Sequence, residues 1–232
     1  MSYVVAPSPV VGVPIEGESG LFPVRRVYCV GRNYAAHARE MGFDPDREPP
    51  FFFCKPADSV CAVSQGDVLS FPYPSESSNV HYEIELVAAI GKGGADIRVE
   101  DALSHVYGYA VGLDMTRRDL QMALREKGRP WELGKAFDHS APIGVLHKAQ
   151  TVPDIGQAAI WLNVNGAERQ KSTVSHLIWS VAETVSHLSR YFRLEEGDLI
   201  YTGTPEGVGA VVSGDLMEGG IDGLGTLAVK VV

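Results

Sequence analysis

Residues 80–90, VHYEIELVAAI, decide the fold class of this chain. Apolar residues at 80, 82, 84 and 86 alternate with polar residues at 81, 83 and 85, which is the period of a β-strand. We expect a half-buried strand whose second face is acidic. The wholly apolar run at residues 106–113, VYGYAVGL, predicts a second strand that is buried on both faces.

Further short elements are expected on the N-terminal side of this pair. The pattern predicts a strand at residues 24–30 and a short helix near residues 34–41. The cluster DPDREPP at residues 44–50 should end that helix before the apolar run at residues 51–54.

On the C-terminal side, residues 116–127 are expected to form a helix that Gly128 and Pro130 terminate. Asn165-Gly166 predicts a hairpin, because both residues accept the positive φ values of a type I′ turn. Residues 175–191 repeat apolar side chains at helical spacing, with a serine as the expected cap. Strands outnumber helices and do not alternate regularly with them, which predicts an α+β, mostly β fold.

The 232 residues suffice for one large domain. Residues 1–20 are rich in Pro, Gly, Ser and Val, and we expect an N-terminal extension there. From residue 21 to residue 232 there is no low-complexity tract, long block of charge or internal repeat, which predicts a single domain.

The composition disfavours several classes of partner. Twenty Lys and Arg against 29 Asp and Glu give a net charge of −9, which repels nucleic acids and anionic membranes. No apolar run approaches the roughly 20 residues of a membrane span. The three cysteines form no CxxC pair, and the N-terminus lacks a basic leader segment. We therefore expect a cytoplasmic protein with reduced thiols and neither a nucleic-acid nor a membrane partner.

Three carboxylates are candidates for a metal site. Glu83 and Glu85 leave the same face of one predicted strand about 7 Å apart, and Asp114 follows a wholly apolar strand, where an unpartnered charge is costly. Such a set suits Mg²⁺, or equally Mn²⁺, and leaves positions for water and substrate oxygens. The alternative for the two glutamates is an ordinary acidic outer face.

Two helical pairs and one lysine are candidates for catalysis or binding. His37 and Glu40 have i, i+3 spacing, so the carboxylate can hold the imidazole as a neutral base. Arg118 and Gln121 share that spacing and could grip a carboxylate or ketone oxygen. Lys135 lies in a stretch that we expect to be non-helical, next to a glycine that permits close backbone approach. For each of these sets, exposure to solvent is the alternative.

The segment TGTPEGVG at residues 202–209 is a glycine-rich loop after an apolar strand. Its hydroxyls and backbone N–H groups could bind an anion. The GK[ST] ending of a phosphate-binding loop is absent, and a tight structural turn is the alternative.

Taken in order, these motifs resemble a known family. The succession GRNYAAHAREMG, FFFCKPADSV, HYEIELVAAIG, GYAVGLDMTRRDLQ, GRPWELGKAFDHSAPIG, LNVNGAERQ, GDLIYTGTPEGVG and GDLMEGGIDGLGTL resembles the fumarylacetoacetate hydrolase family over nearly the whole chain. Within that family the chain is most similar to the short acylpyruvate hydrolases. Two stretches, PPFFFCKPAD and GRPWELGKAFDHSAPIG, are most similar to the bacterial fumarylpyruvate hydrolases of gentisate breakdown.

The resemblance implies a mixed β-sandwich roll with a few peripheral helices, assembled as a homodimer. It also implies a role for each motif residue of this chain. Metal ligands are implied at Glu83, Glu85 and Asp114, a dyad on a lid-like helix at His37 and Glu40, a cation beside the reacting carbonyl at Lys135, and substrate contacts at Arg118, Gln121 and Thr204.

The longer fumarylacetoacetases add an aspartate ligand ahead of the histidine, and the nearest residue here is Asn33. This difference agrees with the short subfamily and counts against fumarylacetoacetate as the substrate. The expected reaction is metal-dependent hydrolysis of a 2,4-diketo acid, with fumarylpyruvate as the best candidate. Oxaloacetate decarboxylation, isomerisation or decarboxylation of a hydroxydienedioate, and a catalytically idle binding module are the alternatives. The distal carboxylate of a fumaryl tail has four candidate partners: Arg32, Lys55, Arg117 and Arg118.

Overall fold

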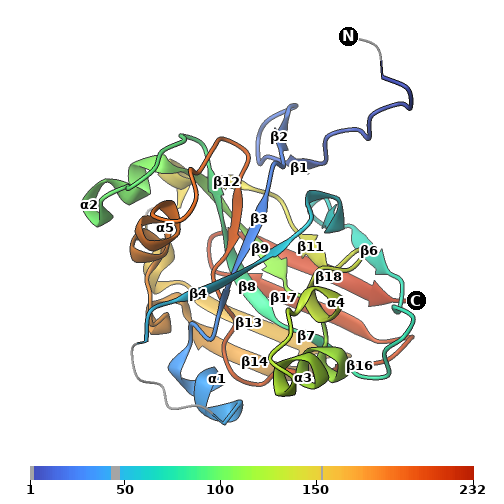
Figure 1. Ribbon diagram of the computed structural model, residues 1–232. Coiled ribbons are helices and arrows are strands. Elements are labelled where there is room, and N and C mark those ends of the chain that lie inside the picture. The colour runs from blue at the N-terminus through green and yellow to red at the C-terminus, as the bar shows by residue number, and fades with distance from the viewer. Residues whose placement is uncertain (1–2, 43–47, 153) are drawn as a thin grey trace.

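Two β-sheets packed face to face form the body of the protein (Figure 1). The computed structural model describes residues 3–42, 48–152 and 154–232. The larger sheet is mixed and has the strand order β4-β3-β15-β8-β9-β11-β5, with β12 also paired to β9. Its strands are β3 (Val27–Gly31), β4 (Phe51–Lys55), β5 (Val60–Ala62), β8 (Ile84–Ile90), β9 (Val106–Leu113), β11 (Ala141–Ile143), β12 (His147–Lys148) and β15 (Leu199–Tyr201).

The second sheet has five strands in the order β14-β13-β17-β18-β6. Its members are β6 (Val68–Phe71), β13 (Ala159–Val164), β14 (Ala167–Thr173), β17 (Leu216–Ile221) and β18 (Gly225–Val231). A three-stranded sheet, β10 (Thr116–Arg117), β7 (Val80–Tyr82) and β16 (Gly209–Val211), lies beside the two larger ones. The predicted mostly β roll is thereby confirmed.

The large sheet is buried on both faces, because alternate side chains of its strands enter two different apolar clusters. Ile84 and Leu86 of β8 join the cluster shared with β13, β17 and β18. Val87 and Ala89 point to the opposite face, where they pack with side chains of β3, β11 and β15. That second face carries the candidate site.

This burial corrects the expected half-buried strand at residues 80–90. The segment is two strands, β7 and β8, separated at Glu83, and all seven residues of β8 are buried. The alternating pattern gave the correct period, but it could not show that the polar face is covered by other elements. The predicted strand at residues 106–113 is confirmed as β9.

Five α-helices are present among the described residues, and they are short and lie on the surface of the roll (Figure 1). They are α1 (Ala35–Glu40), α2 (Val99–Ala102), α3 (Arg118–Glu126), α4 (Glu132–Lys135) and α5 (Val181–Ser189). The helix expected at residues 175–191 is present as α5, but it begins six residues later, at residue 181, because Ser180 and Glu183 form a capping box there. None of the described helices is long and apolar enough to cross a membrane.

The predicted hairpin is confirmed, and the predicted helix at residues 116–127 is confirmed in part. Asn165 and Gly166 have φ values of 51° and 77°, and they connect β13 to β14 as expected of a type I′ hairpin. The predicted helix at residues 116–127 is present as α3, but its first two residues form β10 instead. Of the expected breaker cluster, residues 44–47 lie outside the described residues.

Near the N-terminus, β1 (Gly12–Pro14) and β2 (Leu21–Pro23) form a small hairpin. Val13 is fully buried in the second apolar cluster, so this part of the expected extension packs on the body of the protein. The boundary at residue 20 stays a prediction. All three cysteines are within the described residues and are free thiols.

Candidate active site

Three carboxylates converge on the second face of the large sheet. Strands β8 and β9 are antiparallel with Glu85 opposite Gly112, which places Asp114 beside Glu83. The Asp114 N–H donates to the Glu83 carbonyl oxygen at 2.9 Å. One carboxylate oxygen from each of Glu83, Glu85 and Asp114 lies within 4.8 Å of the others, and all three residues are buried. The acidic outer face is therefore the wrong alternative.

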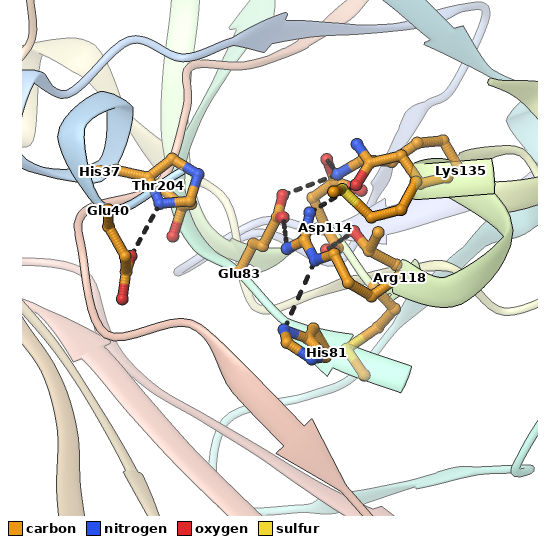
Figure 2. Close-up of polar contacts among 12 residues, drawn as sticks. His37, Glu40, His81, Glu83, Asp114, Arg118, Lys135 and Thr204 are labelled. Atoms are coloured by element: carbon orange, nitrogen blue, oxygen red, sulfur yellow. Dashed lines mark hydrogen bonds and ion pairs between the residues drawn. The ribbon is translucent and has the colours of Figure 1, made fainter. Parts of the chain in front are cut away.

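Cations surround this acid triad (Figure 2). Lys135 Nζ lies 2.7 Å from Glu83 Oε2 and 2.7 Å from Asp114 Oδ2, and Arg118 donates to Glu83 Oε1. Burial alone raises the pKa of Glu83, but the charges of Lys135 and Arg118 outweigh it and hold that pKa well below its ordinary value. Burial in turn lowers the pKa of Lys135, and Asp114 and Glu83 outweigh that effect, so the lysine stays cationic.

Two features indicate that a divalent cation fits the triad. Burial and the charges of Asp114 and Glu83 raise the pKa of Glu85 well above its ordinary value, although Gly203 N–H donates to Glu85 Oε2 at 2.7 Å. Lys55 Nζ forms an ion pair of 2.8 Å with the buried Asp114 Oδ1, which accepts no hydrogen bond from the residues that the structure describes. A bound divalent cation would stabilise the charged form of Glu85, and Asp114 Oδ1 could donate a lone pair to it. Both groups are therefore suited to a hard cation.

Arg118 and Gln121 form one polar face of α3, and both are buried. Arg118 Nη1 donates to Gln121 Oε1 at 2.5 Å, and Arg118 Nε lies 3.5 Å from His81 Nδ1. Burial and the charge of Arg118 lower the pKa of His81 to about 4, so this ring is neutral at pH 7. The structure thus contradicts a solvated face, and it adds His81, which sequence reasoning missed.

His37 and Glu40 form the expected pair on α1. His37 Nδ1 lies 3.1 Å from Glu40 Oε2, and the imidazole is buried while the carboxylate is half exposed. The hydrogen bond to His37 lowers the pKa of Glu40, and the Gly207 N–H, which lies 3.1 Å from Oε1, lowers it further. In Figure 2 His37 and Thr204 lie on one side of Glu83, and Lys135 and Arg118 lie on the other.

The backbone of the glycine-rich loop at residues 202–209 donates hydrogen bonds to two carboxylates of the same chain. Its Gly203 and Gly207 N–H groups donate to Glu85 and Glu40, respectively. Thr204 is buried, and its Oγ1 accepts a hydrogen bond of 2.9 Å from Gln170 Nε2. Gln170 also accepts from the Ile84 N–H at 3.0 Å and so fixes the loop to β8. Sequence reasoning missed Gln170, because a glutamine on a polar hairpin strand carries no signal of burial.

One cleft brings the predicted residues together. Its lining includes eight of them: His37, Glu83, Glu85, Asp114, Arg118, Gln121, Lys135 and Thr204. Glu40 is not part of the lining, but its carboxylate contacts His37, which is. Lys135 is the last residue of the short helix α4, and its Nζ lies in the cleft 5.0 Å from the centroid of the Phe53 ring. The expected non-helical environment of Lys135 is wrong, because residues 132–135 form one helical turn.

Asn33 has a structural role. Its Nδ2 donates to the carbonyl oxygens of Trp179 at 2.9 Å and Thr202 at 2.8 Å, and its Oδ1 accepts from the Trp179 N–H at 2.8 Å. The amide thus connects the start of α1 to two distant loops.

The fold and this site define a family of enzymes. The family model for the fumarylacetoacetate (FAA) hydrolase C-terminal domain matches residues 26–232, so the chain belongs to the fumarylacetoacetate hydrolase family. The crystal structure of a fumarylpyruvate hydrolase from Pseudomonas aeruginosa, in complex with Mn²⁺ and pyruvate, is 66% identical in sequence. It superposes with a TM-score of 0.98 over 100% of this chain and 99% of that one.

Two curated relatives differ in the reaction that they are named for. A fumarylpyruvate hydrolase from a Ralstonia species is 46% identical over 188 residues, which are 81% of this chain and 95% of that protein. A mitochondrial oxaloacetate decarboxylase from Dictyostelium discoideum is 40% identical over 202 residues, covering 87% of this chain and 91% of that protein.

Proposed function

We propose that this protein is a divalent-metal-dependent hydrolase that cleaves the carbon–carbon bond of a 2,4-diketo acid, with fumarylpyruvate as the substrate and fumarate and pyruvate as products. One observation carries the proposal: a buried acid triad and a carboxylate-bound histidine line the same cleft. Similarity to two fumarylpyruvate hydrolases, one of them with Mn²⁺ and pyruvate bound, supports it.

The two halves of the site have separate tasks. Glu83, Glu85 and Asp114 would hold Mg²⁺ or Mn²⁺, which supplies Lewis-acid polarisation of the adjacent carboxylate and 2-oxo oxygens of the diketo acid. Arg118 and Gln121 orient the same end of the substrate through their hydrogen-bonding groups.

The proton chemistry belongs to His37. In the tautomer in which Nδ1–H donates to Glu40, Nε2 takes a proton from a water molecule whose oxygen adds to C4. Lys135 stabilises the resulting oxyanion. The C3–C4 bond then breaks, its electron pair passes to C3, and C4 becomes the new carboxylate of fumarate. The proton that His37 took from water passes to C3, which gives pyruvate and returns His37 to its neutral form.

The test follows loss of the near-ultraviolet enol absorbance of four substrates, each with Mg²⁺, with Mn²⁺ and with EDTA, and identifies the products. The substrates are fumarylpyruvate, maleylpyruvate, acetylpyruvate and oxaloacetate. We expect metal-dependent release of fumarate and pyruvate. In H₂¹⁸O one labelled oxygen should enter fumarate, because water supplies it. Turnover of oxaloacetate alone, giving pyruvate and CO₂, would favour a decarboxylase and would contradict a mechanism in which water attacks C4.

We also propose a homodimer in a reducing compartment, the cytoplasm. The family resemblance supports the dimer, and three free cysteines support the compartment. Light scattering after gel filtration would measure the mass directly: a value near 25.0 kDa, the mass of one chain, would contradict the dimer.

A further inference from the structure

The outer half of the cleft carries a second set of functional groups. Beyond the acid triad, the lining includes the aromatic residues Phe51, Phe53 and Trp131 and two cations, Arg32 and Arg125. The reaction chemistry above uses none of them. They form a region with an apolar wall and a cationic end.

Helix α3 connects the two halves of the cleft. Arg118, Gln121, Met122 and Arg125 follow one another at i, i+3, i+4 and i+7, so they share one helix face, and all four line the cleft. Arg118 contacts Glu83 of the acid triad. Arg125 lies seven residues further on, which is about 10 Å along the helix axis. This distance is comparable to the length of an extended seven-carbon dicarboxylate.

The aromatic wall runs between cations as well. Phe51 and Phe53 lie two residues apart on β4, so their rings leave the same face of the strand about 7 Å apart. The Trp131 ring packs against both, with centroid distances of 5.4 and 6.1 Å. Lys135 Nζ lies 5.0 Å from the Phe53 ring, and Arg32 Cζ lies 5.1 Å from the Phe51 ring. The wall therefore extends from the reacting end to an arginine.

The backbone of β3 is adapted to this arrangement. Gly31 is opposite Phe51, and a Cβ atom at Gly31 would lie 1.9 Å from the Phe51 ring. Arg32 follows directly and has a φ of 56°, a conformation that L-residues seldom adopt. Such strain persists where the surroundings hold a side chain in a required position.

The other candidate cations are used elsewhere. Lys55 is buried and donates to the carbonyl oxygens of Met115 and Lys135. Arg117 lies outside the lining of the cleft, with Cζ 4.5 Å from the Phe137 ring. Arg118 is bound to Glu83 and Gln121 at the inner end.

We propose that Arg32 and Arg125 bind the distal carboxylate of the substrate, and that its flat unsaturated acyl chain lies against Phe51, Phe53 and Trp131. This inference rests on the proposed function and makes the enzyme selective for dianionic acylpyruvates. Both arginines have other interactions within the protein, but a guanidinium carries five N–H donors and can hold a carboxylate beside them.

Electrostatics supports the pairing of these two cations. Burial and then the positive charge of Arg125 lower the pKa of Arg32, while Glu48 acts in the opposite direction. Two guanidinium groups that repel each other across a cleft gain from an anion placed between them.

The test compares fumarylpyruvate with crotonylpyruvate, in which a methyl group replaces the distal carboxylate. The variants are Arg32→Gln, Arg125→Gln and, as a matched control, Arg98→Gln directly before α2, whose exposed guanidinium pairs with Asp101. In the metal-loaded enzyme, each of the first two should raise KM for fumarylpyruvate about 10- to 100-fold, the usual effect of losing a hydrogen bond to a charged group. The KM for crotonylpyruvate should stay within about twofold, and Arg98→Gln should change neither value.

Calorimetric binding of fumarate gives a second readout, in which both variants should bind it at least about tenfold more weakly than the wild type does. Equal losses on both substrates, or an unchanged KM for fumarylpyruvate, would overturn the inference. If the wild-type enzyme cleaves neither substrate, the proposed function fails, and fumarate binding then decides the inference alone: weaker binding in the two variants supports it and equal binding overturns it.

Discussion

Among single residues, Lys55 and Lys135 share Asp114 but contact it from different sides. Lys135 Nζ faces the cleft and also contacts Glu83, whereas Lys55 Nζ is enclosed and donates to two backbone carbonyl oxygens. Lys55 thus fixes the position of Asp114 and of the backbone that carries Lys135. We regard it as a positioning residue rather than a group that touches substrate.

Replacing this buried lysine should destabilise the fold strongly. Lys55→Met would leave Asp114 Oδ1 buried without its ion pair, and breaking a buried pair costs about 3–5 kcal/mol. Urea unfolding monitored by circular dichroism measures the change. The control is Lys148→Met, whose solvent-exposed ion pair with Glu18 should contribute little to stability. Equal stability of the two variants would show that Lys55 does not hold Asp114.

The proposed base makes a separable prediction. His37→Ala should lower kcat by about 10²- to 10⁴-fold, because the water loses its proton acceptor. Its affinity for Mn²⁺, measured calorimetrically, should stay close to the wild-type value, because His37 is not in the acid triad. Glu83→Ala should instead weaken Mn²⁺ binding. Turnover near the wild-type rate in His37→Ala would refute the assigned role.

Between elements, the contact of α3 with α4 determines where Lys135 lies. A Cβ atom at Gly134 would lie 2.9 Å from the backbone nitrogen of Gln121, so the two helices approach as closely as glycine allows. We expect Gly134→Ala to cost about 1–3 kcal/mol by overpacking and to reduce kcat by displacing Lys135. Gly156→Ala is the control, since nothing lies within 4 Å of its added methyl group. Thermal melts and initial rates measure both variants, and normal rates in Gly134→Ala would contradict this account.

The first turn of α3 gives a pH-dependent prediction. Burial pushes the pKa of Asp119 upward, but hydrogen bonds from the Ser78 N–H and the Ser77 hydroxyl, at 2.9 and 2.7 Å, outweigh it and lower that pKa. A lowered pKa in the folded state means stability that is present above the unfolded value of about 3.9 and lost as the pH falls below it.

Asp119→Asn should therefore lower the free energy of unfolding by about 1 kcal/mol at pH 7, the usual net contribution of one hydrogen bond, because Asn keeps one of the two acceptor oxygens that Ser77 and Ser78 contact. The difference from wild type should shrink as the pH approaches 3. Denaturant titrations at several pH values measure it, with the exposed Asp67→Asn as a control. A difference that is constant with pH would mean that the charge of Asp119 does not matter.

The same elements show what a sequence reveals and what it does not. Local patterns predicted β9 from an apolar run, the hairpin from Asn165-Gly166 and the pairing of His37 with Glu40 from their i, i+3 spacing, because each of these depends on neighbours in the chain. Burial of Glu83 and the position of Lys135 depend on residues far away in sequence, so alternation and propensity could not predict them.

For the cleft, ordered motifs pointed to its reacting end, and the structure brings those residues together as expected. The role of the outer wall was not predicted. Phe51, Phe53 and Trp131 lie in stretches that carry the family resemblance, but nothing in the sequence assigns these three side chains to the cleft, and Arg125 looks like a solvated helix residue. A curled sheet and two short helices give them a common surface.

At the scale of the whole molecule, the charge balance of the buried site connects metal binding to stability. Three buried cations, Lys55, Arg118 and Lys135, lie around the acid triad, and the pKa of Glu85 is raised, so the centre carries no large negative charge before a metal ion binds. Folding therefore does not require the ion. An ion that binds the folded state alone still stabilises it by mass action.

Adding Mn²⁺ or Mg²⁺ should accordingly raise Tm continuously with concentration. At about 100 times the dissociation constant the gain is about 2.7 kcal/mol, which corresponds to about 5–11 °C for a chain of this size. In Glu83→Ala and Asp114→Ala the Tm should not respond to metal, because the ligand set is incomplete. Na⁺ at matched ionic strength separates specific binding from screening of the charge of −9. A wild-type Tm that is unchanged by Mn²⁺ and Mg²⁺ would contradict metal binding at this site. It would also contradict the Lewis-acid polarisation of the substrate in the proposed mechanism.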